Sequence, residues 1–113
     1  MMIKMNELIE ELWKEMKSKV KDKSEKEFSV LQVLKGMEEL GEIADLILRD
    51  YGAKRKHKDI SKKEIKRRLG EEIADVMLVL LLLSKNKNID IDKHLKDKIK
   101  IEIERWKAEK VLE

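Results

Sequence analysis

The chain has 113 residues, enough for one domain with a single core, and its 27 Lys and Arg nearly balance its 24 Asp and Glu. Charged residues make up 45% of the chain, aromatic residues 4%, and proline is absent, so long helices are favoured over a β-sandwich or a loop-rich fold. The absence of cysteine excludes a disulfide framework and thiolate chemistry.

Helical periodicity of the apolar residues predicts four helices, at about residues 3–21, 24–50, 61–84 and 92–111. The second and third helices have clear starts, because Ser24 with Glu27 and Ser61 with Glu64 have the spacing of a capping box. No linker, low-complexity tract or long repeat divides the chain. We therefore expect one all-α domain over residues 1–113, with four main helices.

The N-terminal stretch does not have the pattern of an export signal, and the longest apolar run is too short to span a membrane. The N-terminal MMIKMNELIEELWKEM mixes charged and apolar residues and lacks the continuous apolar stretch of a signal peptide. The run VMLVLLLL at 76–83 is far shorter than the roughly 20 residues of a membrane-spanning helix. A cytoplasmic location is the expectation.

The same run, 76–83, predicts self-association. It is apolar on every side, so this part of the third helix should be enclosed, and four helices of one chain can barely surround it. We expect a helical bundle that dimerisation completes, with the third helix packing against its copy in a second chain. The sequence leaves open whether two or four chains assemble.

Two acidic clusters stand out because Glu42 and Asp75 have no basic residue within one helical turn, whereas Glu39 has Lys35 and Glu72 has Arg68 within reach. On the third helix, Glu72 occupies a position of a heptad line whose other members are core aliphatic residues, and Asp75 projects from the same side. On the second helix, Glu39 and Glu42 lie away from the main apolar stripe but share their side with Ile43 and other apolar residues. Lone carboxylates in such places are costly, and pairs of them repel.

A shared cation explains the two pairs better than solvent does. Antiparallel packing of the two helices would bring Glu39, Glu42, Glu72 and Asp75 together as an all-oxygen site. Such ligands select Mg²⁺ or Mn²⁺ over Zn²⁺. Glu38 and Glu71 fit a solvated surface, since Lys35 and Arg67 lie within one helical turn of them.

Three stretches occur in a distinctive order: EELGE at 38–42, EEIADVMLVLLLL at 71–83 and the tail NIDIDKHLKDKIKIEIERW. The first two look like the ExxE and ExxD pair, and the tail like the last segment, of the MazG-like, all-α nucleoside triphosphate pyrophosphohydrolase superfamily, which the sequence therefore resembles. The resemblance covers roughly residues 25–106. It implies an oligomeric enzyme, dimeric or tetrameric, that cleaves a nucleoside triphosphate between its α- and β-phosphates, releasing a monophosphate and pyrophosphate.

Site residues follow from this resemblance by position. Glu39, Glu42, Glu72 and Asp75 would be the Mg²⁺ ligands, with Mn²⁺ as a substitute, and Lys98 and Arg105 would bind phosphate. Glu38 is our candidate for the general base, because it need not be a ligand.

Two features depart from the family pattern. Relatives typically have Asn between that Lys and Arg, where this chain has Glu102, and 29 residues separate Glu42 from Glu72, a long interval for compact members. The interval contains the basic loop 54–58, which is either a solvated loop or a cationic lid over the polyphosphate.

Three other readings stay in competition. A non-enzymatic, dimeric helical interaction module would expose the acidic clusters as a binding surface. A carboxylate-bridged di-iron bundle would need Glu-x-x-His pairs, which Glu39, Glu42 and Glu72 do not form. Nucleic-acid binding fits poorly, because basic residues are interleaved with acidic ones and lack stacking aromatics. Base and sugar preference, the number of ions and the physiological role stay open.

Overall fold

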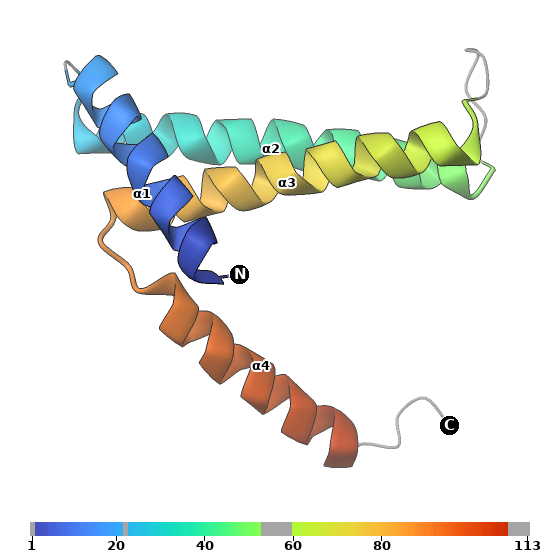
Figure 1. Cartoon of the computed structure of the whole chain (residues 1–113). Coiled ribbons are helices and arrows are strands. Elements are labelled where there is room, and N and C mark those ends of the chain that lie inside the picture. Colours follow the sequence, from blue (N-terminus) through green and yellow to red (C-terminus); the bar gives the residue numbers. More distant parts are fainter. Residues whose placement is uncertain (1, 22, 53–59, 109–113) are drawn as a thin grey trace.

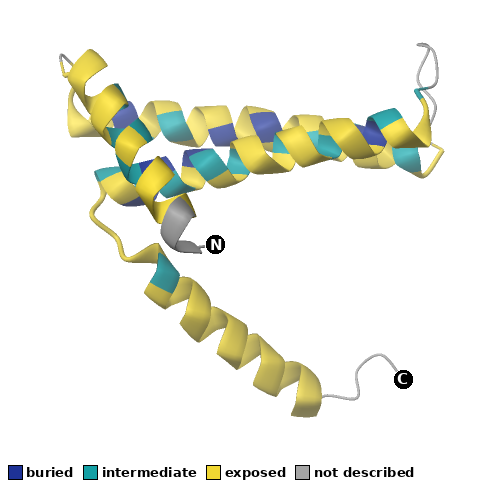
Figure 2. Ribbon diagram, in the orientation of Figure 1, coloured by how far each residue is buried: buried dark blue, intermediate teal, exposed yellow. Residues whose placement is uncertain are grey.

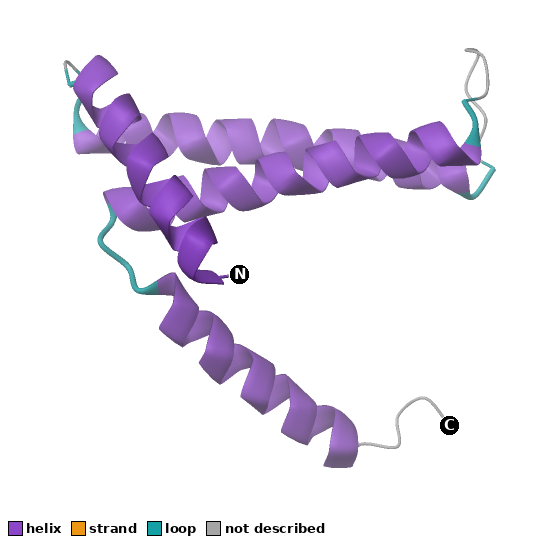
Figure 3. Ribbon diagram, in the orientation of Figure 1, coloured by secondary structure: helices purple, strands orange, loops and turns teal. Residues whose placement is uncertain are grey.

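The structure is a computed structural model that describes residues 2–21, 23–52 and 60–108, with the backbone alone for residues 2–4. These parts of the chain contain four helices and no strand (Figure 3). The helices are α1 (Met2–Lys19), α2 (Glu25–Asp50), α3 (Lys62–Asn86) and α4 (Ile91–Ala108). The predicted all-α fold is therefore confirmed. The basic loop 54–58 lies outside the described residues.

Both predicted helix starts are confirmed as serine N-caps. The Ser24 hydroxyl oxygen accepts a hydrogen bond from the Glu27 backbone N–H at 3.0 Å, and Ser61 accepts one from Glu64 at 3.1 Å. Each cap satisfies a backbone donor that the first helical turn leaves without a partner. After α2, Gly52 takes a φ of +89°, a left-handed conformation that glycine adopts at no steric cost.

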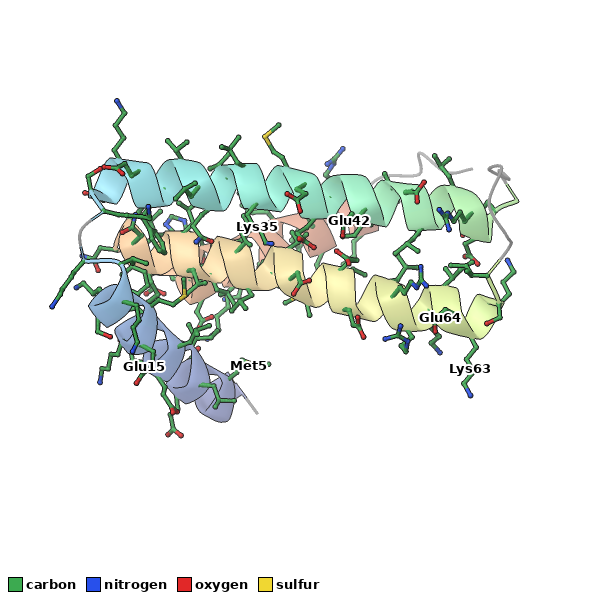
Figure 4. The ribbon with its side chains drawn as sticks, turned by 90° about the horizontal axis from the view of Figure 1, so that it is seen from above. Met5, Glu15, Lys35, Glu42, Lys63 and Glu64 are labelled. Atoms are coloured by element: carbon green, nitrogen blue, oxygen red, sulfur yellow. The ribbon has the colours of Figure 1, made fainter. Side chains whose placement is uncertain are left out.

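An antiparallel pair formed by α2 and α3 is the centre of the fold, and the two helices lie side by side along their length (Figures 1 and 4). Contacts fix the register at both ends: Lys62 Nζ donates to Asp50 Oδ1 at 3.0 Å, and Asn86 Nδ2 donates to Ser29 Oγ at 2.8 Å. Between these ends the helices approach closely at Gly36, where an added Cβ would meet Val79 Cγ1 at 3.4 Å.

The apolar core between the helices is small. Its buried hydrophobic members, among the described residues, are Ile9, Phe28, Leu46, Ile65, Val79 and Leu82. Helix α1 crosses the pair near the C-terminal end of α3, where Trp13 meets Phe28 edge to face at a ring-centroid distance of 5.6 Å. An ion pair between Lys85 and Glu10 also joins α3 to α1.

One chain does not enclose the apolar segment of α3. Val79 and Leu82 are buried, but Met77 and Leu80 remain more than half exposed, at 57% and 53%. This agrees with the expectation that a single chain cannot surround residues 76–83, although the structure describes one chain and the proposed dimer stays a prediction.

The main apolar stripe of α2 is exposed. Its members recur every three or four residues and therefore share one side of the helix: Val30, Val33, Met37, Leu40, Ala44 and Ile47. The other side of α2, which carries Gly36, Glu39, Ile43 and Leu46, packs towards α3. The carboxylates thus lie on the side that the chain itself covers.

Helix α4 projects away from the α2–α3 pair, and none of its residues 91–108 is buried (Figures 1 and 2). Its apolar line, Leu95, Ile99, Ile103 and Trp106, is about half exposed throughout. Within the described ranges, no helix combines the length and apolar character needed to cross a membrane.

Candidate metal centre

Carboxylates from α2 and α3 converge midway along the antiparallel pair. Glu39, Glu72 and Asp75 each offer an oxygen, and these oxygens lie within 4.8 Å of one another. Glu38, Glu39 and Glu42 form a second group that meets the same distance, so Glu39 belongs to both. In Figure 4, Lys35 and Glu42 lie along the line where α2 meets α3.

Helix geometry explains this convergence. Glu39 and Glu42 are three residues apart on α2, as are Glu72 and Asp75 on α3, so each pair projects from one side of its helix. At Gly36, one turn before Glu39, α2 packs towards Val79 of α3, so the two helices are in contact beside the carboxylate pairs. The structure brings Glu39, Glu72 and Asp75 of the predicted set together, whereas Glu42 groups with Glu38 and Glu39.

Burial makes the cluster electrostatically costly. Glu39 is only 5% exposed, and Lys35 Nζ lies 3.6 Å from its Oε1. Glu72 Oε2 is buried and has no hydrogen-bond partner within the described part of the chain. Arg68, which lies one turn from Glu72, donates its Nε–H to Glu64 instead, at 2.9 Å. A buried carboxylate oxygen without a donor requires a proton or a cation.

The pKa values of the two central carboxylates diverge accordingly. The adjacent carboxylates of Glu39 and Glu42, together with burial, raise the pKa of Glu72 to about 8. The neighbouring Glu72 lowers the pKa of Glu39, and the Lys35 charge lowers it further. In the metal-free protein the proton shared by this pair therefore resides on Glu72.

The residues present fit a hard divalent cation. The donor set consists of carboxylate oxygens from Glu39, Glu72 and Asp75, with Glu42 and Glu38 beside them, and oxygen-only ligation suits Mg²⁺ or Mn²⁺. A cation at this position would give the buried Glu72 Oε2 the partner that it does not have among the described residues.

A pocket of about 470 Å³ adjoins the cluster. The residues that line it are Glu38, Gly41, Glu42, Asp45, Leu46, Arg49, Arg68 and Glu72. Glu38, Glu42 and Glu72 were predicted as site residues, whereas Asp45, Arg49 and Arg68 were not. The available signal was spacing: Arg49 follows Glu42 by seven residues, and Arg68 precedes Asp75 by seven.

The two predicted phosphate-binding residues lie elsewhere in the chain. Lys98 and Arg105 are both on α4 and are absent from the pocket lining. Glu102, the residue that departs from the family pattern, approaches Arg105, with Oε1 3.5 Å from Nη1. A single chain thus does not bring these cations to the carboxylates, and their role stays a prediction.

The raised pKa of Glu72 predicts that the metal-free protein loses stability as the pH rises. The folded state holds a proton on Glu72 that an unfolded chain, with a pKa near 4.5, has released, so this stabilisation is present below about pH 4.5 and is lost as the pH approaches and passes 8. In EDTA, the melting temperature of the wild type should fall between pH 5 and 8 by more than that of Glu72→Gln, in which the amide cannot ionise.

Glu71→Gln is the matched control, because Glu71 is exposed and bound to Arg67. Its melting temperature should follow the wild-type profile. Parallel profiles for the wild type and Glu72→Gln would show that Glu72 carries no proton in the folded state.

Comparisons with known proteins return no relative: no protein-family model, no curated protein and no solved structure matches this chain.

Proposed function

We propose that the protein hydrolyses nucleoside triphosphates between the α- and β-phosphates in a Mg²⁺-dependent reaction, as a MazG-like pyrophosphohydrolase that removes or limits particular nucleotides. The supporting observation is the convergence of Glu39, Glu72 and Asp75 from two helices, with one Glu72 oxygen buried and without a hydrogen-bond donor. The resemblance of EELGE and EEIAD to the family's acidic motifs agrees with this use of the cluster.

Glu39, Glu42, Glu72 and Asp75 would hold the cation. When bound, Mg²⁺ screens the negative phosphate oxygens and acidifies water, which phosphate-ester hydrolysis requires. The pocket beside the cluster has room for a phosphate chain. Glu39 is buried and Glu72 is half-buried with one buried oxygen, so water solvates these carboxylates only in part and their attraction for a cation is stronger.

Glu38 is the proposed general base. It lines the pocket, is exposed, and has an oxygen within 4.8 Å of those of Glu39 and Glu42. An exposed carboxylate at the edge of the cluster can accept the proton of an attacking water while its neighbours hold the cation.

Replacing Glu38 by Gln should lower kcat by about a hundredfold or more, the usual contribution of a general base, and leave Mg²⁺ binding intact. Pyrophosphate release at saturating substrate measures the first effect, and the Mg²⁺-induced rise in melting temperature measures the second. An unchanged kcat would remove Glu38 from the mechanism. Loss of the Mg²⁺ response would instead identify it as a ligand.

Lys98 and Arg105 remain proposed phosphate ligands. Because α4 projects from its own chain, these side chains would serve the pocket of a second copy in a homodimer or homotetramer more readily than their own. The exposed apolar lines of α2 and α4 supply surface for such an assembly.

The activity is tested by incubating the protein and Mg²⁺ with a panel of canonical and modified nucleoside triphosphates. We expect pyrophosphate and a monophosphate from at least one of them. Orthophosphate as the product would contradict the proposed bond, and no product from any substrate would contradict the proposed activity.

The exposed apolar surface of α2 and α4 favours one alternative, a dimeric helical interaction module without catalysis. Such a module needs no cation, so Mg²⁺ should not raise its melting temperature. A Mg²⁺ response that Glu72→Gln removes would exclude this alternative.

A further inference from the structure

Two arginines line the pocket beside the metal-binding carboxylates, and Arg68 lies one helical turn from Glu72. Arg49 lies two helical turns beyond Glu42 on the same side of α2, and Arg68 lies two turns before Asp75 on the same side of α3. Because the helices are antiparallel, both displacements run towards the C-terminus of α2 and the N-terminus of α3. Each is about 10 Å along the helix axis.

One N–H of the Arg49 guanidinium group lacks a hydrogen-bond acceptor among the described residues. Asp45 Oδ2 lies 3.3 Å from Arg49 Nε, yet this Nε is buried and makes no hydrogen bond within the described part of the chain. A guanidinium group has five N–H donors and presents them as a planar fork that matches phosphate oxygens. An anion in the pocket would therefore give a buried donor an acceptor.

Arg68 is held in place by its own helix. Its Nε donates to Glu64 Oε2 at 2.9 Å, and Arg67 donates to the same carboxylate at 2.7 Å. The two arginines lower the pKa of Glu64 to about 2, so this anchor stays ionised at neutral pH. Such exposed pairs contribute little stability, but they orient the arginine side chain.

We propose that Arg49 and Arg68 bind the terminal phosphates of the substrate, so that the phosphate chain extends along the pocket from the carboxylates to the arginines. This assignment rests on the proposed function and adds the direction in which the substrate lies. The departing pyrophosphate occupies the arginine end, and the nucleoside monophosphate occupies the carboxylate end.

Because the proposal places the departing pyrophosphate at the two arginines, the binding of inorganic pyrophosphate tests it. In the presence of Mg²⁺, inorganic pyrophosphate should bind at least about tenfold more weakly to Arg49→Gln and to Arg68→Gln than to the wild type, since each loses a charge-assisted phosphate contact. Affinity for the nucleoside monophosphate product should change by less than about twofold. Titration calorimetry of both ligands against the full chain gives the comparison.

Arg67→Gln is the matched control for Arg68. Arg67 is its neighbour, pairs with Glu64 and Glu71, and does not line the pocket, so its loss should leave pyrophosphate binding unchanged. Arg49→Lys and Arg68→Lys keep the charge without the fork and should recover part of the affinity. These lysine variants also keep the test open if a glutamine variant does not fold.

Unchanged pyrophosphate affinity in both glutamine variants would overturn the assignment, as would an equal loss for pyrophosphate and monophosphate. A wild type that releases pyrophosphate from a triphosphate, together with this result, would leave the proposed function standing and remove only the arginine assignment. A wild type that neither hydrolyses a triphosphate nor binds pyrophosphate would overturn both.

Discussion

Replacing Glu39 by Gln should abolish Mg²⁺-dependent hydrolysis, with kcat/KM lowered by more than about a hundredfold, because even the loss of an outer partner of a metal site costs about 10- to 100-fold. Glu39 is the buried residue that both carboxylate groups share, so a cation held by either group would have Glu39 as a ligand. The same substitution should remove the rise in melting temperature that Mg²⁺ produces in the wild type.

The control for this variant is Glu71→Gln, which removes one carboxylate from the same acidic stretch at an exposed position. Its activity and its Mg²⁺ response should stay close to those of the wild type. If Glu39→Gln and Glu71→Gln lose activity equally, the effect is one of general charge and the proposed ligand role is wrong.

A charge placed in the exposed apolar stripe of α2 should have a large effect on assembly. Leu40 and Met37 are 55% and 64% exposed in the single chain, at the middle of a stripe that runs most of the helix length. A contiguous apolar surface of this kind marks a protein–protein interface. Leu40→Glu should convert the expected homodimer into monomers and lower the melting temperature, because it places a charge within the interface.

Sedimentation at several protein concentrations measures this change in assembly. Leu40→Met is the control, since it keeps an apolar side chain of similar volume and should stay oligomeric. A wild type that sediments as a monomer at all concentrations would contradict the proposed assembly. A Leu40→Glu protein that assembles like the wild type would exclude the α2 stripe from the interface.

The helices and their starts could be predicted because they depend on local sequence. Ser24 and Ser61 cap α2 and α3 through hydrogen bonds to residues three positions later, which the sequence alone makes visible. The carboxylate pairs were predictable for a similar reason. Spacing of three residues fixes a common side of the helix, and only the antiparallel pairing of α2 with α3 had to be assumed.

Periodicity did not reveal which side of α2 the chain covers. The stripe around Met37 and Leu40 is more continuously apolar than the side with Glu39, yet α3 packs on the latter. Burial of apolar surface is equally favourable against the same chain and against another chain. The more apolar stripe around Met37 and Leu40 can therefore pack against a second copy.

The two arginines that line the pocket could not be predicted from the sequence for a different reason. Arg49 and Arg68 each have an acidic residue four positions earlier on their own helix, and in sequence this looks like an ordinary surface ion pair. Their common pocket arises only when α2 and α3 pack. Lys98 and Arg105, which the family resemblance indicated, lie on α4, and none of the residues 91–108 of this helix is buried.

The most direct test is the position of a bound cation. In crystals grown with Mn²⁺, the anomalous signal should locate an ion between α2 and α3, roughly 2 Å from oxygens of Glu39, Glu72 and Asp75. Anomalous density elsewhere on the surface, or none at saturating Mn²⁺, would contradict the account.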